Sequence, residues 1–321
     1  MNERTELPKK AVIGRTVHCN GAVNSQWGPA AAGWVCWMAS HRLLAGFLAA
    51  CAALATAAPT VPVAGTELKT DRVRGELVAP KNPAHRPIYD ELKQERLIER
   101  IAEFLAPFRL PRDVVMKVEG CDGVVNAFYG DGVITVCYEY LDYIRDNARQ
   151  AQAAGEPTPP TAIGGATIDV FLHEMGHAVF DLLEVPLFGR EEDAADQFSA
   201  YLLLHLTGDQ ARPLIQGIAF LGRRETREAM AGHQQLKHYA DEHGLPAQRY
   251  FNLLCTAYGF NEKLFADAVG PGRLPAERAE SCDDDYAQLH NAFRKLIWPH
   301  IDQTRLSEVR AKNLLEVDTG D

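Results

Sequence analysis

Residues 171–204 read FLHEMGHAVFDLLEVPLFGREEDAADQFSAYLLL. The stretch puts His173 and His177 at positions i and i+4 of an apolar helical pattern, with Glu174 between them. Side chains at i and i+4 project from one face of a helix, so two imidazoles can reach one metal ion. The pattern H-E-x-x-H is typical of a zinc site whose glutamate is the general base. Because uncompensated polar groups are costly in an apolar helix, we predict a metal site here.

A third protein ligand is needed, because catalytic zinc is held by three side chains and keeps one position open. The acidic candidates are Asp181, Glu192 and Asp196. Asp181 continues the face that carries the histidines, but it lies about 12 Å along the helix axis from His173. Ligands placed along one straight helix cannot surround a metal tetrahedrally, so Asp181 is disfavoured.

The other two candidates follow a break in the helix. Pro186 and Gly189 turn the chain, and helical periodicity resumes at Arg190. A returning helix would direct Glu192 at the metal from another side. Asp196, one turn later, would hydrogen-bond the far nitrogen of a ligand histidine. The predicted site is one Zn²⁺ per chain, with ligands His173, His177 and Glu192, general base Glu174 and supporting residue Asp196.

The rest of the chain indicates one α+β domain over residues 88–321, with strands early and helices late. Residues 88–105 have the apolar spacing of an amphipathic helix. β-branched runs between residues 113 and 141 predict two or three strands, the last two forming a hairpin around Gly130-Asp131-Gly132. Helical periodicity covers residues 138–153 and nearly everything after Leu206. Residues 58–87 are rich in Pro, Ala and Thr, which is typical of a linker.

The first 57 residues differ from this body. Residues 38–57 have a short basic start, an apolar stretch and a small-residue cleavage pattern at 55–57, as a secretory signal has. A signal begins at the initiating methionine, so we expect translation to start at Met38. Residues 1–37 would then be an upstream extension of the reading frame.

The same leader resembles a lipoprotein signal. Leu48-Ala49-Ala50-Cys51 is similar to a bacterial lipobox, in which Cys51 would carry a lipid anchor. Both interpretations predict an exported protein, either periplasmic or secreted. Neither leaves a transmembrane helix in the mature chain, because no later apolar run reaches the ~18 residues that a span requires.

Export would place the cysteines after the leader in an oxidising compartment. These four cysteines allow three pairings. The pairing of sequence neighbours joins Cys121 to Cys137 and Cys255 to Cys282, and closes two short loops. A zinc ribbon would need C-x-x-C pairs, which are missing. We therefore expect two disulfides.

The composition bounds the class of partner. The 321 residues are 46% hydrophobic and 24% charged, with a formal net charge of -10. An acidic chain without a Lys/Arg-rich run repels a phosphate backbone, so we expect no nucleic-acid partner.

HEMGH followed by EDAAD resembles the gluzincin branch of the zincin metallopeptidases, which has HExxH on one helix and ExxAD on the next. The segments CDGVVNAFY, ITVCYEYL, DEHGLPAQRYFNLLCTAYG and LPAERAESC extend a resemblance to a bacterial family of exported proteins named as metallopeptidases. The resemblance implies the ligand, base and supporting roles given above. It also implies a zincin-like fold with a small N-terminal sheet, whose edge at Asn126-Ala127-Phe128 flanks the cleft. The substrate it implies is a peptide or a protein, which could pair with that edge as an added strand. The interval between His177 and Glu192 is shorter than in many gluzincins, so no peptide specificity is carried over.

Zincins usually add a Tyr, His or Arg that stabilises the oxyanion. The candidates are His238, His243 and Arg249, each of which could equally be a surface or capping residue. The predicted function is hydrolysis of peptide bonds. The alternative is a zinc-stabilised envelope protein that binds a partner without cutting it. Its metal site would be closed by a fourth protein ligand, Asp193 or Asp181.

Overall fold

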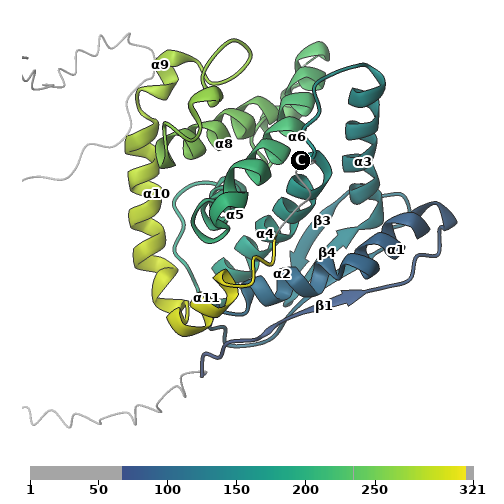
Figure 1. Cartoon of the computed structure of the whole chain (residues 1–321), viewed down its shortest axis with the longest axis vertical. Helices are drawn as coiled ribbons and strands as arrows, with labels where there is room; N and C mark the ends of the chain where they lie inside the picture. Colours follow the sequence, from purple (N-terminus) through teal and green to yellow (C-terminus); the bar gives the residue numbers. More distant parts are fainter. Residues whose placement is uncertain (1–66, 234, 316–321) are drawn as a thin grey trace, which may run out of the picture. The chain divides into compact units, whose positions relative to one another are not determined.

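The computed structural model describes residues 67–233 and 235–315. The predicted upstream extension, signal and lipobox lie outside these residues. Within the described ranges, no helix is long and apolar enough to cross a membrane. A small four-stranded sheet is followed by a mostly helical region, so the fold is of the predicted α+β class (Figure 1).

The sheet has the strand order β1-β2-β4-β3. Strands β1 (Val73–Leu77), β2 (Val114–Glu119) and β4 (Val133–Cys137) are parallel neighbours, and β3 (Ala127–Gly130) pairs antiparallel to β4. The β3–β4 hairpin confirms the prediction. Its two-residue turn consists of Asp131 and Gly132, both at positive φ (50° and 80°), as a type I′ turn requires.

The predicted linker was wrong in its second half. Residues 73–77 form β1, and residues 83–85 form a short 3₁₀ helix, η1 (Pro83–His85). The sequence VRGEL resembles a linker because Val73 is the one buried residue of this edge strand. Glycine is required at position 75 because a Cβ there would lie 2.7 Å from the Cγ2 of Ile98. The domain therefore begins well before residue 88.

The helix predicted over residues 88–105 is two helices, α1 (Arg86–Glu95) and α2 (Leu97–Leu105). They meet at Arg96, which has left-handed backbone angles (φ 53°). At 3.6 residues per turn, the apolar positions before and after Arg96 would face opposite sides of one continuous helix. The break lets both sets of apolar side chains enter the same core.

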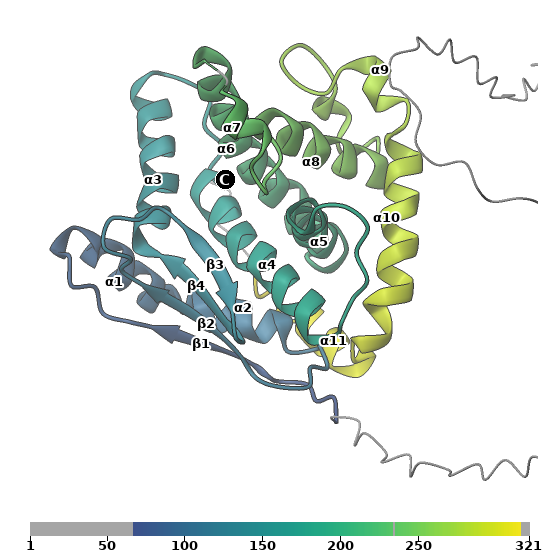
Figure 2. The same cartoon turned by 180° about the vertical axis from the view of Figure 1, so that it is seen from behind.

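One face of the sheet is the more deeply buried. Val114, Met116 and Val118 of β2 are fully buried, whereas the alternating residues of that strand are partly exposed. Figure 2 shows the sheet in front of α2, with α4 (Ala162–Leu182) beside the edge strand β3. The edge strand therefore lies next to the helix that carries the H-E-x-x-H pattern.

The long helices after the sheet pack at close quarters. A Cβ at Gly165 of α4 would lie 2.7 Å from the backbone oxygen of Leu214, so α4 and α6 approach closely there. The helices are α3 (Tyr138–Ala153), α4, α5 (Glu191–Leu206), α6 (Ala211–Ala231), α7 (Leu236–Tyr239), α8 (Pro246–Phe260), α9 (Ala276–Ala279), α10 (Cys282–Leu296) and α11 (Gln303–Arg310). Short 3₁₀ helices are η2 (Gly208–Gln210), η3 (Ala266–Ala268) and η4 (Trp298–His300).

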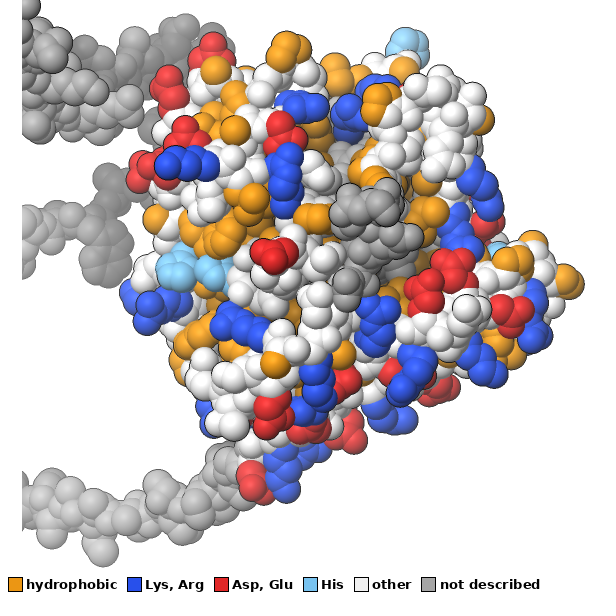
Figure 3. All heavy atoms as spheres, viewed as in Figure 1, with side chains coloured by type: hydrophobic (Ala, Val, Ile, Leu, Met, Phe, Trp, Pro, Cys, Tyr) orange, Lys and Arg blue, Asp and Glu red, His pale blue; other side chains and the backbone are white. Residues whose placement is uncertain are grey.

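Two disulfides join the predicted pairs, Cys121 with Cys137 and Cys255 with Cys282. The first fixes the loop before β3 to the end of β4. The second joins α8 to α10, where Gly259 allows close approach to the backbone of Cys282. On the face seen in Figure 3, acidic and basic side chains are interspersed rather than gathered in a patch of one sign.

Candidate metal centre

Two consecutive helices carry the predicted site residues. His173, Glu174 and His177 lie on α4, and Glu192 and Asp196 lie on α5. A Cβ at Gly176 would lie 3.2 Å from the Cα of Ala195, so the two helices are nearly in backbone contact beside the histidines. The first turn of α5 is acidic, which suits the positive end of the helix dipole. That turn is where Glu192 faces α4.

Each histidine of the α4 pair is held at its Nδ1 atom by a carboxylate. The Nδ1 atom of His173 lies 2.9 Å from Oδ1 of Asp196. The Nδ1 atom of His177 lies 2.8 Å from Oε1 of Glu191. A carboxylate at Nδ1 favours the tautomer with its proton there, and so leaves Nε2 free to bind a metal.

The Nε2 atoms of the two histidines converge with the carboxylate of Glu192. The two Nε2 atoms are 3.3 Å apart. Glu192 lies 3.0 Å from Nε2 of His173 and 3.5 Å from Nε2 of His177. Ligand atoms around a tetrahedral zinc with bonds of about 2.0–2.1 Å are themselves about 3.3 Å apart. These donors therefore fit a zinc ion in both chemistry and spacing.

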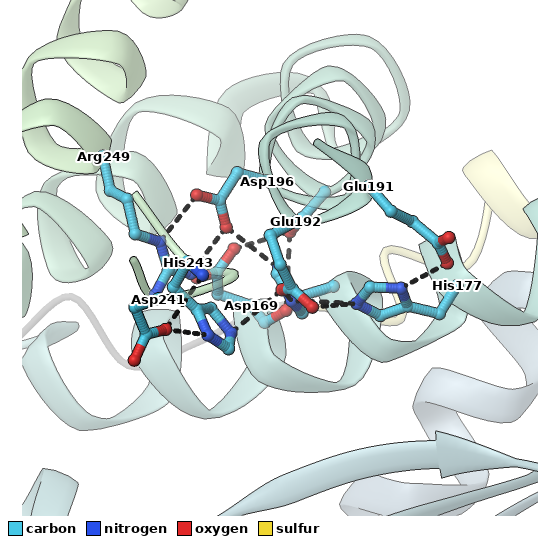
Figure 4. A network of polar contacts seen from close by, with 10 residues as sticks. Asp169, His177, Glu191, Glu192, Asp196, Asp241, His243 and Arg249 are labelled. Atoms are coloured by element: carbon cyan, nitrogen blue, oxygen red, sulfur yellow. Dashed lines mark hydrogen bonds and ion pairs between the residues drawn. The ribbon is translucent and has the colours of Figure 1, made fainter. Parts of the chain in front are cut away.

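A third histidine reaches the same carboxylate from the segment between α7 and α8. Nε2 of His243 lies 2.9 Å from Oε2 of Glu192, and its Nδ1 lies 3.4 Å from Oδ1 of Asp241. His243 and His177 approach Glu192 from opposite sides (Figure 4). Nitrogen and oxygen atoms of His173, Glu192 and His243 lie within 4.8 Å of one another, so His243 is also within reach of a shared ion.

Arg249 contacts the site through Asp196. Its Nε atom donates to Oδ2 of Asp196 at 2.7 Å, and its Nη2 atom donates to Oδ1 at 2.6 Å (Figure 4). Both carboxylate oxygens are therefore bound by one guanidinium. This two-point contact orients Asp196, the residue that holds His173.

The electrostatics of the site favour charged carboxylates and protonated imidazoles. Burial opposes the charged form of His173, but hydrogen bonds to Asp196 and Glu192 outweigh burial and raise its pKa to about 10. The pKa of Glu192 is lowered because its hydrogen bonds to the three histidines outweigh its own desolvation. The hydrogen bond to Glu192 raises the pKa of His243. A divalent cation would take the place of these protons between the same donors.

Glu174 is buried at the same level of α4, with 6% of its surface exposed. Burial raises the pKa of its carboxyl group. Among the described residues, no hydrogen bond or ion pair is found for this carboxylate, although His173 and His177 act on its charge. A carboxylate with a raised pKa and uncommitted oxygens is suited to accepting a proton.

Other candidate residues have different partners. Asp181 accepts hydrogen bonds from Tyr129 and Arg112, which hold it on the hairpin side of α4. Asp193 lies 4.0 Å from Arg190, and no contact joins it to the described histidines. His238 accepts a hydrogen bond from the backbone of Gln235, so it caps α7 as the capping alternative predicted.

Two carboxylates that contact the candidate site histidines were not predicted from the sequence. Glu191 holds His177, and the signal for it was its place in the first turn of the acidic helix beside Glu192. Asp241 faces Nδ1 of His243 and also accepts a hydrogen bond from that residue's backbone N–H. The D-x-H spacing was visible, but it is short and common, so it predicted no contact.

Comparisons with known proteins agree with this chemistry. The model of a family described as “Putative metallopeptidase” matches residues 78–297, which include the H-E-x-x-H helix, the acidic helix and both disulfides. No curated protein and no solved structure matches the chain.

Proposed function

The chain belongs to this metallopeptidase family, and we propose that it is an exported, zinc-dependent peptidase of gluzincin type. His173, His177 and Glu192 would hold one Zn²⁺, with Glu174 as general base. The observation that carries the proposal is the orientation of the imidazoles: each α4 histidine has a carboxylate at Nδ1, and each turns Nε2 toward Glu192. Histidines that were only solvated on a helix surface would not be expected to share this orientation.

The residues divide the chemistry of peptide hydrolysis between them. A bound zinc ion would supply Lewis acidity, which lowers the pKa of water and polarises a carbonyl oxygen. Glu174 would accept the proton of the attacking water and pass it to the leaving nitrogen. With Glu192 engaged by the metal, the Nε2 atom of His243, whose side chain is 41% exposed, would be released to donate to the developing oxyanion.

The edge strand suggests how a substrate binds. Among the described strands, β3 pairs with β4 alone, and it lies beside α4. An extended peptide could pair with its free edge and so pass along the helix that carries His173 and Glu174. This supports a polypeptide substrate in extended conformation, without defining its sequence.

Export is supported by the two disulfides, because such bonds persist in oxidising compartments. The predicted leader at residues 38–57 would direct it, with Cys51 as the site of a lipid anchor if the lipobox is used. Amino-terminal sequencing of the native protein tests this. A peptide from residues 1–37 in the mature chain would contradict the predicted start and the cleavage together.

The first experiment is metal analysis of the purified mature protein by mass spectrometry, with His173→Ala and Glu192→Ala. We expect one zinc per chain, lost or much weakened in both variants. Incubation with a mixture of unstructured peptides, with and without a chelator, should then give cleavage products that depend on the metal. A wild-type protein that neither contains zinc nor binds it when added would overturn the proposal.

The alternative of a closed, non-catalytic zinc site has one observation in its favour, the contact of His243 with Glu192. The fourth ligand would then be His243, in place of the predicted Asp193 or Asp181. The two functions differ in the effect of His243→Gln. In a closed site the variant loses zinc affinity, and the wild type cleaves none of the peptides.

A further inference from the structure

Arg249 and Asp196 form a two-point contact between α8 and α5. The Nε and Nη2 atoms of Arg249 donate to different oxygens of Asp196, at 2.7 and 2.6 Å. Planar pairs of this kind are among the strongest charge-assisted hydrogen bonds, and they fix the plane of the carboxylate. Without the guanidinium, the single contact with Nδ1 of His173 would be left to orient the Asp196 carboxylate among the described residues.

The orientation of that carboxylate decides the orientation of His173. Oδ1 of Asp196 accepts from Arg249 and also lies 2.9 Å from Nδ1 of His173. The ring of His173 in turn directs Nε2 at Glu192, 3.0 Å away. The contacts form one chain from α8, through α5, to the histidine on α4.

The surroundings of Arg249 supply no competing hydrogen-bond acceptor at comparable distance among the described residues. Its side chain lines a small cavity, together with Asp196, Asp169, Glu225 and Tyr140. Asp169 accepts from Ser199, and Glu225 accepts from Tyr143. The guanidinium is therefore committed to Asp196 and offsets the charge of the nearby carboxylates.

We propose that Arg249 is a positioning residue for the metal centre, which acts through Asp196 to hold His173 in the tautomer and orientation that bind zinc. The inference rests on the proposed function. It gives Arg249 a different role from oxyanion stabilisation, because its donor atoms are directed at Asp196 rather than at a substrate.

The first test measures zinc affinity by chelator competition for Arg249→Gln and Arg249→Lys. We expect the Kd to rise about 10-fold in the glutamine variant, the lower end of the effect of losing a partner of a ligand histidine. Lysine offers one point charge rather than a planar fork, so it should rescue only part of the affinity. The matched control is Arg305→Gln, which breaks a similar contact with Asp71 outside the site and should leave the Kd unchanged.

The second test shows whether Arg249 acts through Asp196. In a double-mutant cycle on zinc Kd, Arg249→Gln should add little to the loss caused by Asp196→Ala. Nitrogen-15 NMR of the zinc-loaded protein should find His173 bound through Nε2 with its proton on Nδ1 in the wild type, and a mixture of binding modes in Arg249→Gln. A role in folding alone would change the melting temperature but neither of these two readouts.

The outcomes separate the inference from the function it rests on. Wild-type protein that binds no zinc would remove both. The positioning role of Arg249 would be refuted if folded Arg249→Gln bound zinc as tightly as the wild type. It would also be refuted if the losses of zinc affinity caused by Arg249→Gln and Asp196→Ala added fully in the double variant. Either result would leave the proposed peptidase function standing.

Discussion

Gly176 of α4 and Ala195 of α5 meet without a side chain between them, since a Cβ on Gly176 would lie 3.2 Å from the Cα of Ala195. The contact sets the separation of the two helices one residue away from His177. We predict that Gly176→Val forces α5 outward, lowers the free energy of unfolding by about 1–3 kcal/mol and weakens zinc binding. Thermal unfolding and chelator competition measure the two effects.

The control for this prediction is Gly222→Ala in α6. A Cβ at Gly222 would meet Tyr250 at 3.5 Å, an ordinary contact. Replacing glycine by alanine inside a helix should then stabilise the protein by up to about 1 kcal/mol, with zinc affinity unchanged. Equal zinc affinity in Gly176→Val and wild type would show that helix spacing does not control the site.

Glu174→Gln should separate metal binding from turnover. Glutamine keeps the shape of the side chain but cannot accept the proton, so kcat should fall about 10²–10⁴-fold. Zinc content should stay at the wild-type level because Glu174 makes no hydrogen bond or ion pair with the described ligands. Metal analysis and peptide cleavage, run on one preparation, check both halves. A fully active variant would refute the mechanism.

The proposed role of His243 predicts that activity falls at high pH. In the metal-free protein the hydrogen bond to Glu192 raises the pKa of His243, which favours the protonated imidazole that can donate. Activity that needs this proton is present below the raised pKa and is lost as the pH rises through it. His243→Gln should lower kcat about 100-fold and abolish that limb of the pH profile. An unchanged profile in the variant would assign the limb to another group.

Asp169 predicts a pH-dependent change in stability. Burial raises its pKa from 3.8 to about 6, so the folded protein favours the protonated form. For an acid with a raised folded-state pKa, stability falls as the pH rises from about 4 to about 6. Asp169→Asn should therefore be more stable than wild type by on the order of 2 kcal/mol at pH 8, and equal to it below pH 4. Denaturant unfolding of the metal-free proteins at several pH values tests this, and a constant difference would contradict it.

The disulfide beside the edge strand should contribute substantially to stability. The Cys121–Cys137 bond closes a loop with a sequence separation of 16, for which chain entropy predicts about 3 kcal/mol. Glu139 accepts hydrogen bonds from the N–H groups of Cys121 and Gly123, so the loop keeps a second attachment. The double variant Cys121→Ser/Cys137→Ser should be less stable but still folded by circular dichroism. An unchanged unfolding midpoint would mean that Glu139 alone holds the loop.

Local sequence signals predicted much of this fold. The Asp131-Gly132 turn defined its hairpin, and apolar periodicity located α4 and α5. The misses have physical causes. β1 looked like a linker because an edge strand with a glycine packed on Ile98 needs few apolar residues. The break at Arg96 is visible only as a shift in the phase of the apolar pattern, which a window over the whole segment averages out.

Some contacts of the candidate site could likewise be predicted from the sequence, and others could not. His173 and His177 share a helix face, and Glu192 follows after one turn of the chain, so their association could be predicted from spacing. His238 and His243 could not be ranked from sequence, because both belong to one polar segment. Only the packing of that segment decides that His238 caps α7 whereas His243 meets Glu192.

A short connection joins α4, which ends at Leu182, to α5, which begins at Glu191. The three proposed ligands belong to one helical hairpin, so bringing them together costs little loop-closure entropy. A newly synthesised chain that has formed only this hairpin would already offer zinc the three proposed donors, before the residues of α8 pack against it. Metal binding could thus precede completion of the fold. The affinity of the site for zinc would then rise in a second step, when Arg249 binds Asp196.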